Sequence, residues 1–492
     1  MLLGMQAGLS AGNIGALTFG AFVGIVVGII PGLGPMVGMV VLLPFSFALS
    51  PDRALSLLLG IFCGGYYGGA IPAILMRTPG VPSSLITSFD GFPLTRRGEA
   101  QRALSAALMG SFAGGVLSVF ILIFLAPLLA HVAASFGPPE YFSAALFGVV
   151  LVVMAYRERL SQGLLLLGLG LWLSTVGIDG PTLSPRFCFG LLSLQYGLHI
   201  VPVCLGLFGI GQTLILVEKQ ILQTRTMSLT RRTLDFSKLL ETFRYWKTML
   251  KSGVIGTFVG LLPGTGSILA SFMSYEAAKR TSKNPEKFGK GTPEGCLAAE
   301  GGNNAVPAGA MIPLLTLGIP GDALSAVLLG VFTINGIYPG PLLLIKEPVL
   351  INTLYFSMLL INIVAFLMLA LWLRPFAMIV RVNSSVLAVV IMVLSLVGIY
   401  SVNTRLFDAV VAIVMGVLGY ILLRLKWPIV TLVMGFILGE ILEERLRESL
   451  SLGDGNPLIF LTRPISAGLF AATALIILIP LILDRRKGRQ RH

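Results

Sequence analysis

Charged side chains are scarce in this sequence. Only 12% of its 492 residues are Asp, Glu, Lys or Arg, against about 25% in an average soluble domain, and its mean hydropathy is +0.90. A soluble fold is therefore excluded. Apolar runs such as 14–30, 141–156, 354–373 and 465–483 are near the about 20 residues that a helix needs to cross a bilayer. The sequence predicts an all-α polytopic membrane protein.

Residues for metal or acid–base chemistry are also few. The three histidines have no metal-ligand spacing, and no HExxH or GxSxG motif occurs. The four cysteines have no paired spacing, which argues against both a disulfide framework and a metal knuckle. We therefore expect no enzyme, no catalytic residue, no cofactor, and no metal beyond a coupling sodium ion.

Basic residues outnumber acidic ones, giving a net charge of +13. In a soluble protein this excess would suggest nucleic acid as a partner. Here the Lys and Arg residues cluster in short loops between apolar runs, as the positive-inside rule expects for a protein in a lipid bilayer. Nucleic acid is therefore not expected as a partner.

A unit of sequence occurs twice in the chain. Residues 20–34 read GAFVGIVVGIIPGLG and residues 252–266 read SGVIGTFVGLLPGTG, a spacing of 232. Further on, GGAIPAILMRTPGVPSS around Pro79 recurs as GAMIPLLTLGIPGDALS around Pro320, a spacing of 241. The nine extra residues fit the polar loop 282–295. Gly/Pro-interrupted segments at corresponding places in two repeats indicate the binding site of a secondary transporter.

The charges of the loops predict that the two copies face opposite ways. In the first copy, Arg96, Arg97 and Arg102 follow the second break, whereas in the second copy the basic run 279–290 follows the first break. Because Lys and Arg mark the cytoplasmic side, we predict two inverted-topology repeats with broken or re-entrant helices that meet near the midplane. The basic tail is expected in the cytoplasm and the uncharged N-terminus outside. Since that N-terminus lacks a basic n-region, its first segment is expected to stay in the membrane.

The expected units follow from this repeat. They are a first transmembrane repeat (1–218), a basic cytoplasmic linker (219–251), a second transmembrane repeat (252–450), and a C-terminal transmembrane helix with a basic tail (451–492). The first repeat carries an extra Gly- and Pro-containing loop, 178–199, which is expected to form an ordered turn outside the membrane.

The two PGxG motifs, 31–35 and 263–267, place glycines where one helix can stop and another can start. A helix that starts there points free N–H groups at the break, which suits a carboxylate. A packing kink is the alternative, but the duplication favours a site. The predicted substrate-binding residues are Pro31, Gly32, Gly34, Arg77, Thr78, Pro79, Gly80, Ser83, Pro263, Gly264, Thr265, Gly266, Ser267, Asn303, Asn304, Pro320 and Gly321.

The stretch 294–322 is too polar to face lipid. Its Glu300, Asn303, Asn304 and Asp322 are the predicted ligands of a coupling ion, because carboxylate and amide oxygens suit sodium and charges within a bilayer are costly. The amides could instead hold helices together, and the carboxylates could lie at an interface. Two adjacent amides are not expected to face one partner on a regular helix, so we expect a local break at Asn303.

Three other side chains each have two possible roles. Arg77 could pair with an anionic substrate or snorkel to a lipid headgroup. Tyr66 and Tyr67, which lie between two glycine pairs, could supply hydroxyl groups to the site or fill its wall.

Several of these motifs together resemble a known family. PGLGPMVGMVVLLP from residue 31, GGYYGGAIPAILMRTPGVPSSLITSFDGFPLTRRGEAQRAL from residue 64, PGTGS, SKNPEKFGKGTPEG and NNAVPAGAMIPLLTLGIPGD are similar to the large membrane subunit of the tripartite tricarboxylate transporters. The resemblance covers nearly the whole chain. It implies a multi-pass protein of the bacterial inner membrane that imports citrate-like carboxylates with a small membrane subunit and a periplasmic solute-binding protein.

This chain departs from the family pattern at three places. It has Gly301-Gly302 where alanines are usual, Arg77 where a polar amide is usual, and Asp322 where serine is usual. The last two alter the charge beside the predicted site, and Arg77 would favour a more highly charged anion.

The sequence thus predicts a secondary active transporter subunit that imports a tri- or dicarboxylate by symport, with sodium as the coupling ion. One alternative is a proton-coupled transporter of another organic anion. An alternative of a different class is an intramembrane enzyme that acts on a lipid-linked substrate, although the cluster of acidic or histidine residues that such chemistry needs is missing.

Overall fold

Helices account for almost all of the ordered structure. The computed structural model describes residues 2–219, 234–263, 266–379, 384–403 and 405–489. Within these residues the strands β1 (Gly177–Ile178) and β2 (Pro185–Arg186) form one antiparallel hairpin. The helices α2 (Ala11–Ile29), α4 (Pro51–Met76), α6 (Ala100–Ala133), α7 (Pro138–Ala155), α18 (Pro348–Leu371) and α21 (Leu406–Arg424) are long and apolar enough to cross a membrane. The predicted all-α polytopic class is confirmed.

Helix boundaries recur at the two spacings found in the sequence. α2 and α3 (Gly34–Ser46) are interrupted around Pro31, and α13 (Trp246–Leu261) and α14 (Gly266–Thr281) are interrupted 232 residues later. α4 and the 3-10 turn η1 (Pro82–Leu85) correspond in the same way, 241 residues on, to α15 (Pro293–Leu317) and α16 (Ala323–Ile334). Both long helices end at a left-handed residue, Arg77 with φ 58° and Gly318 with φ 71°. The duplication in sequence is therefore also present in the backbone.

Glycines bring equivalent helices together in each copy. A Cβ atom added at Gly28 of α2 would overlap the carbonyl oxygen of Gly65 in α4, and one added at Gly260 of α13 would lie 2.8 Å from the carbonyl oxygen of Val306 in α15. Both pairs occupy matching positions, because 28 and 260 differ by 232 and 65 and 306 differ by 241. Only a residue without a side chain permits such close backbone contact.

The long helices α4 and α15 run in opposite directions. Along α6, Gly110 lies against Leu297 and Gly114 against Gly301, so α6 and α15 are parallel. In contrast, α6 and α4 are antiparallel. Tyr67 of α4 and Gly115 of α6 both lie beside Asn362, whereas Ile71, later in α4, lines a cavity with Leu104, which is earlier in α6. Opposite directions are what inverted copies require. The orientation of the copies in a membrane remains a prediction.

The second broken segment of each copy packs against helices of the other copy. η1 of the first copy packs on α14 and α15, and α16 of the second copy packs on α3 and α4. A buried carboxylate reinforces this exchange: Asp90 in α5 (Ser88–Arg96) accepts hydrogen bonds from the Tyr275 hydroxyl at 2.8 Å and from the backbone N–H groups of Gly291 and Thr292. The two halves are therefore interlocked around their broken segments.

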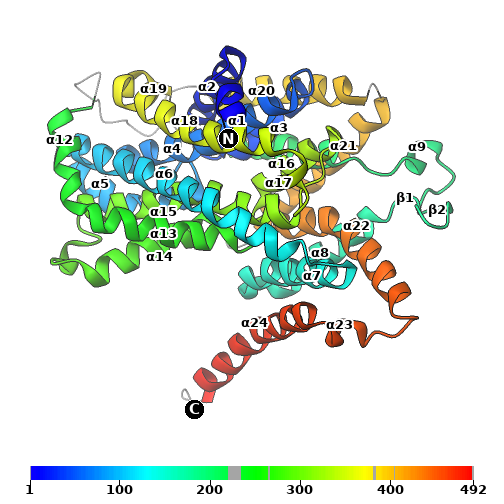
Figure 1. The fold of residues 1–492 in the computed structure, drawn as a ribbon. Coiled ribbons are helices and arrows are strands. Elements are labelled where there is room, and N and C mark those ends of the chain that lie inside the picture. Colours follow the sequence, from blue (N-terminus) through cyan, green and yellow to red (C-terminus); the bar gives the residue numbers. More distant parts are fainter. Residues whose placement is uncertain (1, 220–233, 264–265, 380–383, 404, 490–492) are drawn as a thin grey trace.

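Most of the remaining elements pack around this interlocked centre, whereas the C-terminal helices extend away below the bundle (Figure 1). In the first half they are α1 (Leu2–Gly8), η2 (Arg157–Arg159), α8 (Leu160–Ser174), α9 (Leu192–Gln195), α10 (Ile200–Cys204), the π-helical turn η3 (Leu205–Ile210) and α11 (Gly211–Lys219). Next come α12 (Phe236–Glu241), η4 (Thr242–Tyr245), η5 (Pro285–Lys287), α17 (Leu343–Lys346), α19 (Leu373–Ile379), α20 (Ser384–Asn403), α22 (Ile429–Leu452), α23 (Ile459–Thr462) and α24 (Pro464–Arg489). The boundary predicted at residue 252 lies inside α13, which begins at Trp246.

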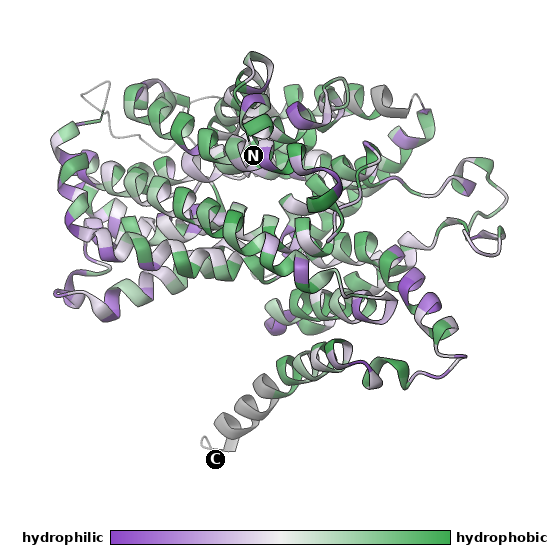
Figure 2. Cartoon of the chain, in the orientation of Figure 1, coloured by the Kyte–Doolittle hydropathy of each residue, from purple (hydrophilic) through white to green (hydrophobic). Residues whose placement is uncertain are grey.

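Basic loops that are far apart in sequence meet at one end of the bundle. Arg97 donates to the carbonyl of Lys290 at 2.6 Å, and Arg102 pairs with Glu241 at 3.2 Å. Figure 2 shows hydrophilic residues gathered at this left-hand end, around α12 and the loop after α14, and again at the right-hand end, while the helices between them are mostly hydrophobic. Loops that were each expected in the cytoplasm are thus on the same side of the molecule.

Candidate functional site

The first PGxG break and the TPG break lie side by side. Gly32 has φ 89° and Gly34 has φ 69°, values that L side chains rarely adopt. A Cβ atom added at Gly80 would overlap the carbonyl oxygen of Gly28, and one added at Gly34 would meet Val81 at 4.0 Å. The structure therefore brings the predicted residues around Pro31 and those around Pro79 into one region.

The second copy repeats this arrangement. A Cβ atom added at Gly321 would lie 2.8 Å from both the carbonyl oxygen of Gly260 and the Cα of Ala310, so the break that contains Pro320 lies beside the end of α13. Gly266 begins α14 with φ 66° and has open space where a side chain would be. Pro263 contacts the region of Gly148 in α7. Gly264 and Thr265 lie outside the described residues.

A polar cluster centred on Glu300 is buried between the copies. The Glu300 side chain is 0% exposed. Its Oε1 accepts hydrogen bonds from Ser84 Oγ at 3.0 Å and Thr87 Oγ1 at 2.5 Å, and both donors follow the first-copy break. Its Oε2 accepts from Asn303 Nδ2 at 3.1 Å and Asn304 Nδ2 at 3.2 Å. Residues of both copies therefore hold one carboxylate.

The cluster has acceptor atoms that no donor fills. Among the described residues, the Oδ1 atoms of Asn303 and Asn304 are buried without a hydrogen-bond partner, as is the Oγ of Ser83, the residue before Ser84. The described ion pairs include no basic side chain at Glu300. A buried carboxylate and unfilled amide oxygens are costly unless a cation or proton compensates them. The cluster therefore gathers a carboxylate and two unfilled amide oxygens at one buried place.

The predicted helix break at the paired asparagines is wrong. α15 is continuous from Pro293 to Leu317, and the break comes only at Gly318. Asn303 and Asn304 are three and four residues after Glu300, and both positions face the same residue one turn back on a regular helix. A continuous helix therefore brings both amides to one carboxylate, and the neighbouring glycines Gly301 and Gly302 let α6 and α14 approach it.

Asp322, the fourth predicted ion ligand, lies in a different place. Its side chain accepts from the backbone N–H of Ser325 at 2.8 Å and caps the start of α16. No hydrogen bond of the described residues joins it to Glu300 or to the asparagines. The Tyr66 hydroxyl is near enough to Asp322 and Ser267 to interact electrostatically with both. Asp322 is thus grouped with the second break rather than with the Glu300 cluster.

The two tyrosines have different surroundings. Tyr66 is buried, and its hydroxyl is near the second break. Tyr67 donates to Asn362 Oδ1 at 2.9 Å and lines a small, mostly apolar cavity with Ser111. Ser111 in turn accepts from Asn304 at 2.8 Å, so this cavity borders the Glu300 cluster.

Arg77 caps α4 and its side chain is exposed, without a partner among the described ion pairs. This position is compatible with both roles predicted for Arg77, which are pairing with an anionic substrate and reaching to a lipid headgroup. Thr78 and Pro79 beside it are partly exposed.

Sequence reasoning missed several polar groups of this region. Ser84, Thr87 and Ser111 complete the Glu300 cluster, and the Gln212 side chain donates to the carbonyl of Gly32. Gln212 follows the π-helical turn η3, a feature often found at functional sites. Of these four, Ser111 is a single polar residue in an apolar stretch, whereas Ser84, Thr87 and Gln212 each adjoin another polar residue.

The Glu300 cluster has no counterpart in the other copy. The 241-residue spacing relates Glu300 to Leu59 and Thr87 to Leu328. Both leucines are 0% exposed and belong to the main apolar core. Both breaks thus occur in each copy, whereas the Glu300 carboxylate corresponds to a leucine in the first copy. Among the described residues, no group of three or more His, Cys, Asp or Glu side chains could hold a metal ion.

Comparison with known proteins gives concordant matches. Residues 14–434 match the tripartite tricarboxylate transporter TctA family. A protein of Agrobacterium vitis, described as an uncharacterized 52.8 kDa protein in the TAR-I ttuC' 3' region, is 36% identical over 98% of this chain and 97% of its own length. A second A. vitis protein, described as an uncharacterized protein in the TAR-II ttuC' 3' region, is 37% identical over 48% of this chain and 97% of its own length. No solved structure matches.

Proposed function

This chain belongs to the tripartite tricarboxylate transporter TctA family, and we propose that it imports a citrate-like tri- or dicarboxylate across the bacterial inner membrane by sodium symport. It is a membrane protein of a transporter family and not an enzyme. We further propose that a periplasmic solute-binding protein delivers the substrate and that a small membrane subunit completes the system.

One observation carries the ion-coupling part of this proposal: Glu300 is fully buried, has no basic partner among the described ion pairs, and lies beside two amide oxygens without donors. Sodium prefers carboxylate and uncharged oxygen ligands, and Glu300, Asn303 and Asn304 supply both kinds. Ser83 adds a buried hydroxyl oxygen without a partner.

The carboxylate is proposed to bind between the two pairs of breaks. Helices α3 and α14 start at the PGxG motifs, and free backbone N–H groups at a helix start attract an anion. Pro31, Gly32, Gly34, Thr78, Pro79 and Gly80 would form one wall. Pro263, Gly266, Ser267, Pro320 and Gly321 would form the other wall, with Asp322 and the Tyr66 hydroxyl at its edge.

A proton is the second candidate for the coupling ion. All four side chains at the Glu300 carboxylate act as donors to it, an arrangement that stabilises the ionised form. The unfilled amide oxygens of Asn303 and Asn304 offer further ligands that sodium can use and that a single proton on Glu300 would leave unfilled, so sodium is the ion that we propose.

The test is uptake of radiolabelled citrate by cells that produce this chain together with the proposed small membrane subunit and solute-binding protein. We expect saturable uptake that stops when the gene for this chain is deleted. Unlabelled tri- and dicarboxylates should compete, and amino acids and sugars should not. Wild-type citrate uptake in the deletion strain, or competition by neutral solutes alone, would contradict the proposed substrate class.

A further inference from the structure

The loop between α8 and α10 exposes large apolar side chains outside the bundle. Figure 1 shows β1, β2 and α9 projecting at the right, beyond the ends of the long helices and away from α12 and the basic loops on the left. Leu183, Phe189 and Leu192 are 76%, 78% and 73% exposed, and Tyr196 is 66% exposed. Exposed apolar groups gathered in this way are typical of an interaction surface.

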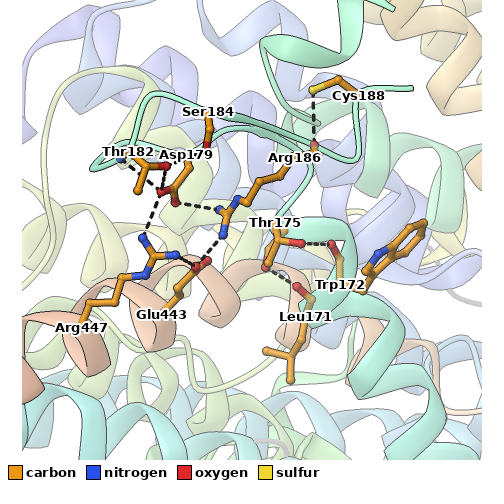
Figure 3. Close-up of polar contacts among 11 residues, drawn as sticks. Leu171, Trp172, Thr175, Asp179, Thr182, Ser184, Arg186, Cys188, Glu443 and Arg447 are labelled. Atoms are coloured by element: carbon orange, nitrogen blue, oxygen red, sulfur yellow. Dashed lines mark hydrogen bonds and ion pairs between the residues drawn. The ribbon is translucent and has the colours of Figure 1, made fainter. Parts of the chain in front are cut away.

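An ion-pair network holds this loop in place (Figure 3). Asp179, 4% exposed, accepts from Thr182 Oγ1 at 2.6 Å and from Arg447 at 3.1 Å, and it pairs with Arg186. Glu443 of α22 bridges both arginines, at 2.6 Å and 2.5 Å. The hydrogen bonds from Thr182 and Arg447 lower the pKa of Asp179 to about 2. Because the pKa is lowered, this attachment persists at ordinary pH and is lost only as pH falls through about 2.

The backbone of the loop adopts unusual conformations at three apolar residues. Leu183, Phe187 and Phe189 have φ values of 53°, 51° and 47°, a region that bulky L residues rarely enter. Such conformations persist only where the surroundings impose them, and they are frequent at functional sites. Here the ring of Phe187 packs edge-on against that of Trp172, with 5.6 Å between the ring centroids. The loop is therefore anchored at its base while Leu183 and Phe189 point outward into exposure.

Position and charge indicate what covers this surface. The loop projects past the ends of the long helices (Figure 1), and we infer that it lies beyond the hydrocarbon that would surround those helices. Its two charged residues, Asp179 and Arg186, are both used in the network. Arg405 stacks on the Tyr196 ring at 4.4 Å from its centroid, so the apolar surface for recognition is formed by Leu183, Phe189 and Leu192. The family is tripartite, so the transport system includes other protein components. An aqueous component on this side is the occupant that these observations favour.

We propose that the segment 181–196, presented by the Asp179 network, is the docking surface for the soluble solute-binding protein of the transport system. This inference rests on the proposed function for the identity of the partner. The partner would contribute an apolar depression that receives Leu183, Phe189 and Leu192. Recognition would therefore depend little on salt.

The first test replaces Leu183, Phe189 and Leu192 together by Ser. The matched control replaces Tyr338, Leu342 and Ile345 by Ser, since these residues are similarly exposed, at 74%, 56% and 70%, in another loop. Because a few apolar anchors carry most of the affinity of an interface, we expect uptake at limiting concentrations of the solute-binding protein to fall about tenfold or more in the first variant only. Equal uptake by both variants, at equal amounts in the membrane, would overturn the proposal.

The second test places a photoreactive benzoylphenylalanine at Phe189 or, as the control, at Tyr338. We expect illumination of cells to attach the proposed solute-binding protein at position 189 and not at position 338. Cross-links only to lipid or to a second copy of this chain, in cells with normal uptake, would overturn the docking surface. This readout needs no transport of citrate, so a wrong substrate class and a wrong docking surface give different results.

Discussion

Replacement of Glu300 by Gln is expected to abolish the sodium dependence of uptake while the protein still folds. The substitution keeps the shape of the side chain but removes the charge that a cation would balance. Loss of a hydrogen-bonding contact to a charged group costs about 1.5 to 3 kcal/mol, or roughly a 10- to 100-fold loss. We therefore expect the sodium-stimulated rate to fall by about that factor, and sodium to raise the melting temperature of the wild type but not of the variant.

Glu294 provides a matched control on the same helix. It also accepts hydrogen bonds from hydroxyl groups, Thr248 at 2.9 Å and Ser282 at 2.7 Å, but it lies at the start of α15 beside the basic loop. Glu294→Gln is expected to keep sodium-dependent uptake. If Glu300→Gln retained wild-type sodium dependence, the cluster would be a structural network, and the ion site would have to be sought at Asp322.

Gly28→Val is expected to remove most folded protein from the membrane. The added Cβ would overlap the carbonyl oxygen of Gly65, and Gly28 is itself in contact with Gly80 of the adjacent break. Backbone atoms of two helices cannot move apart without separating α2 from α4. Overpacking typically lowers the free energy of unfolding by about 1 to 3 kcal/mol. Because the added Cβ meets rigid backbone, we expect Gly28→Val to lie at or above the upper end of that range. Fluorescence-detected size-exclusion chromatography would show little monodisperse protein.

Gly15→Val is the control for this helix. Gly15 also lies in α2, but a Cβ atom there has no neighbour within 4 Å. The same gain in side-chain volume and the same change in helix propensity should leave a normal chromatographic peak. Equal recovery of both variants would show that the glycine contact between α2 and α4 is not needed for the fold.

Much of the scaffold was predictable because helix stops have local causes. One helix ends and the next begins at the motif that contains Pro31, and the same happens at the motif that contains Pro263. Because proline and glycine interrupt a helix locally, both breaks could be placed from the sequence. Apolar runs of sufficient length likewise fixed most spans. The recurrence of both motifs at fixed spacings indicated two structurally equivalent copies.

The composition of the Glu300 cluster was only partly predictable. Asn303 and Asn304 were correctly singled out, but the break predicted there was wrong because both face Glu300 across one helical turn. Ser84 and Thr87 come from the other copy, more than two hundred residues away, and no local pattern reports that η1 crosses onto α15. The grouping of Asp322 with Tyr66 and Ser267 has the same non-local origin.

The most direct test of the account is simultaneous measurement of radioactive sodium and labelled citrate uptake in membrane vesicles that contain the complete transport system. If the Glu300 cluster holds the coupling ion, citrate added with its solute-binding protein should drive sodium into the vesicles in a fixed ratio. Dissipating the sodium gradient should then stop citrate accumulation, whereas dissipating the proton gradient should not. Citrate accumulation without accompanying sodium uptake would contradict sodium symport at this site.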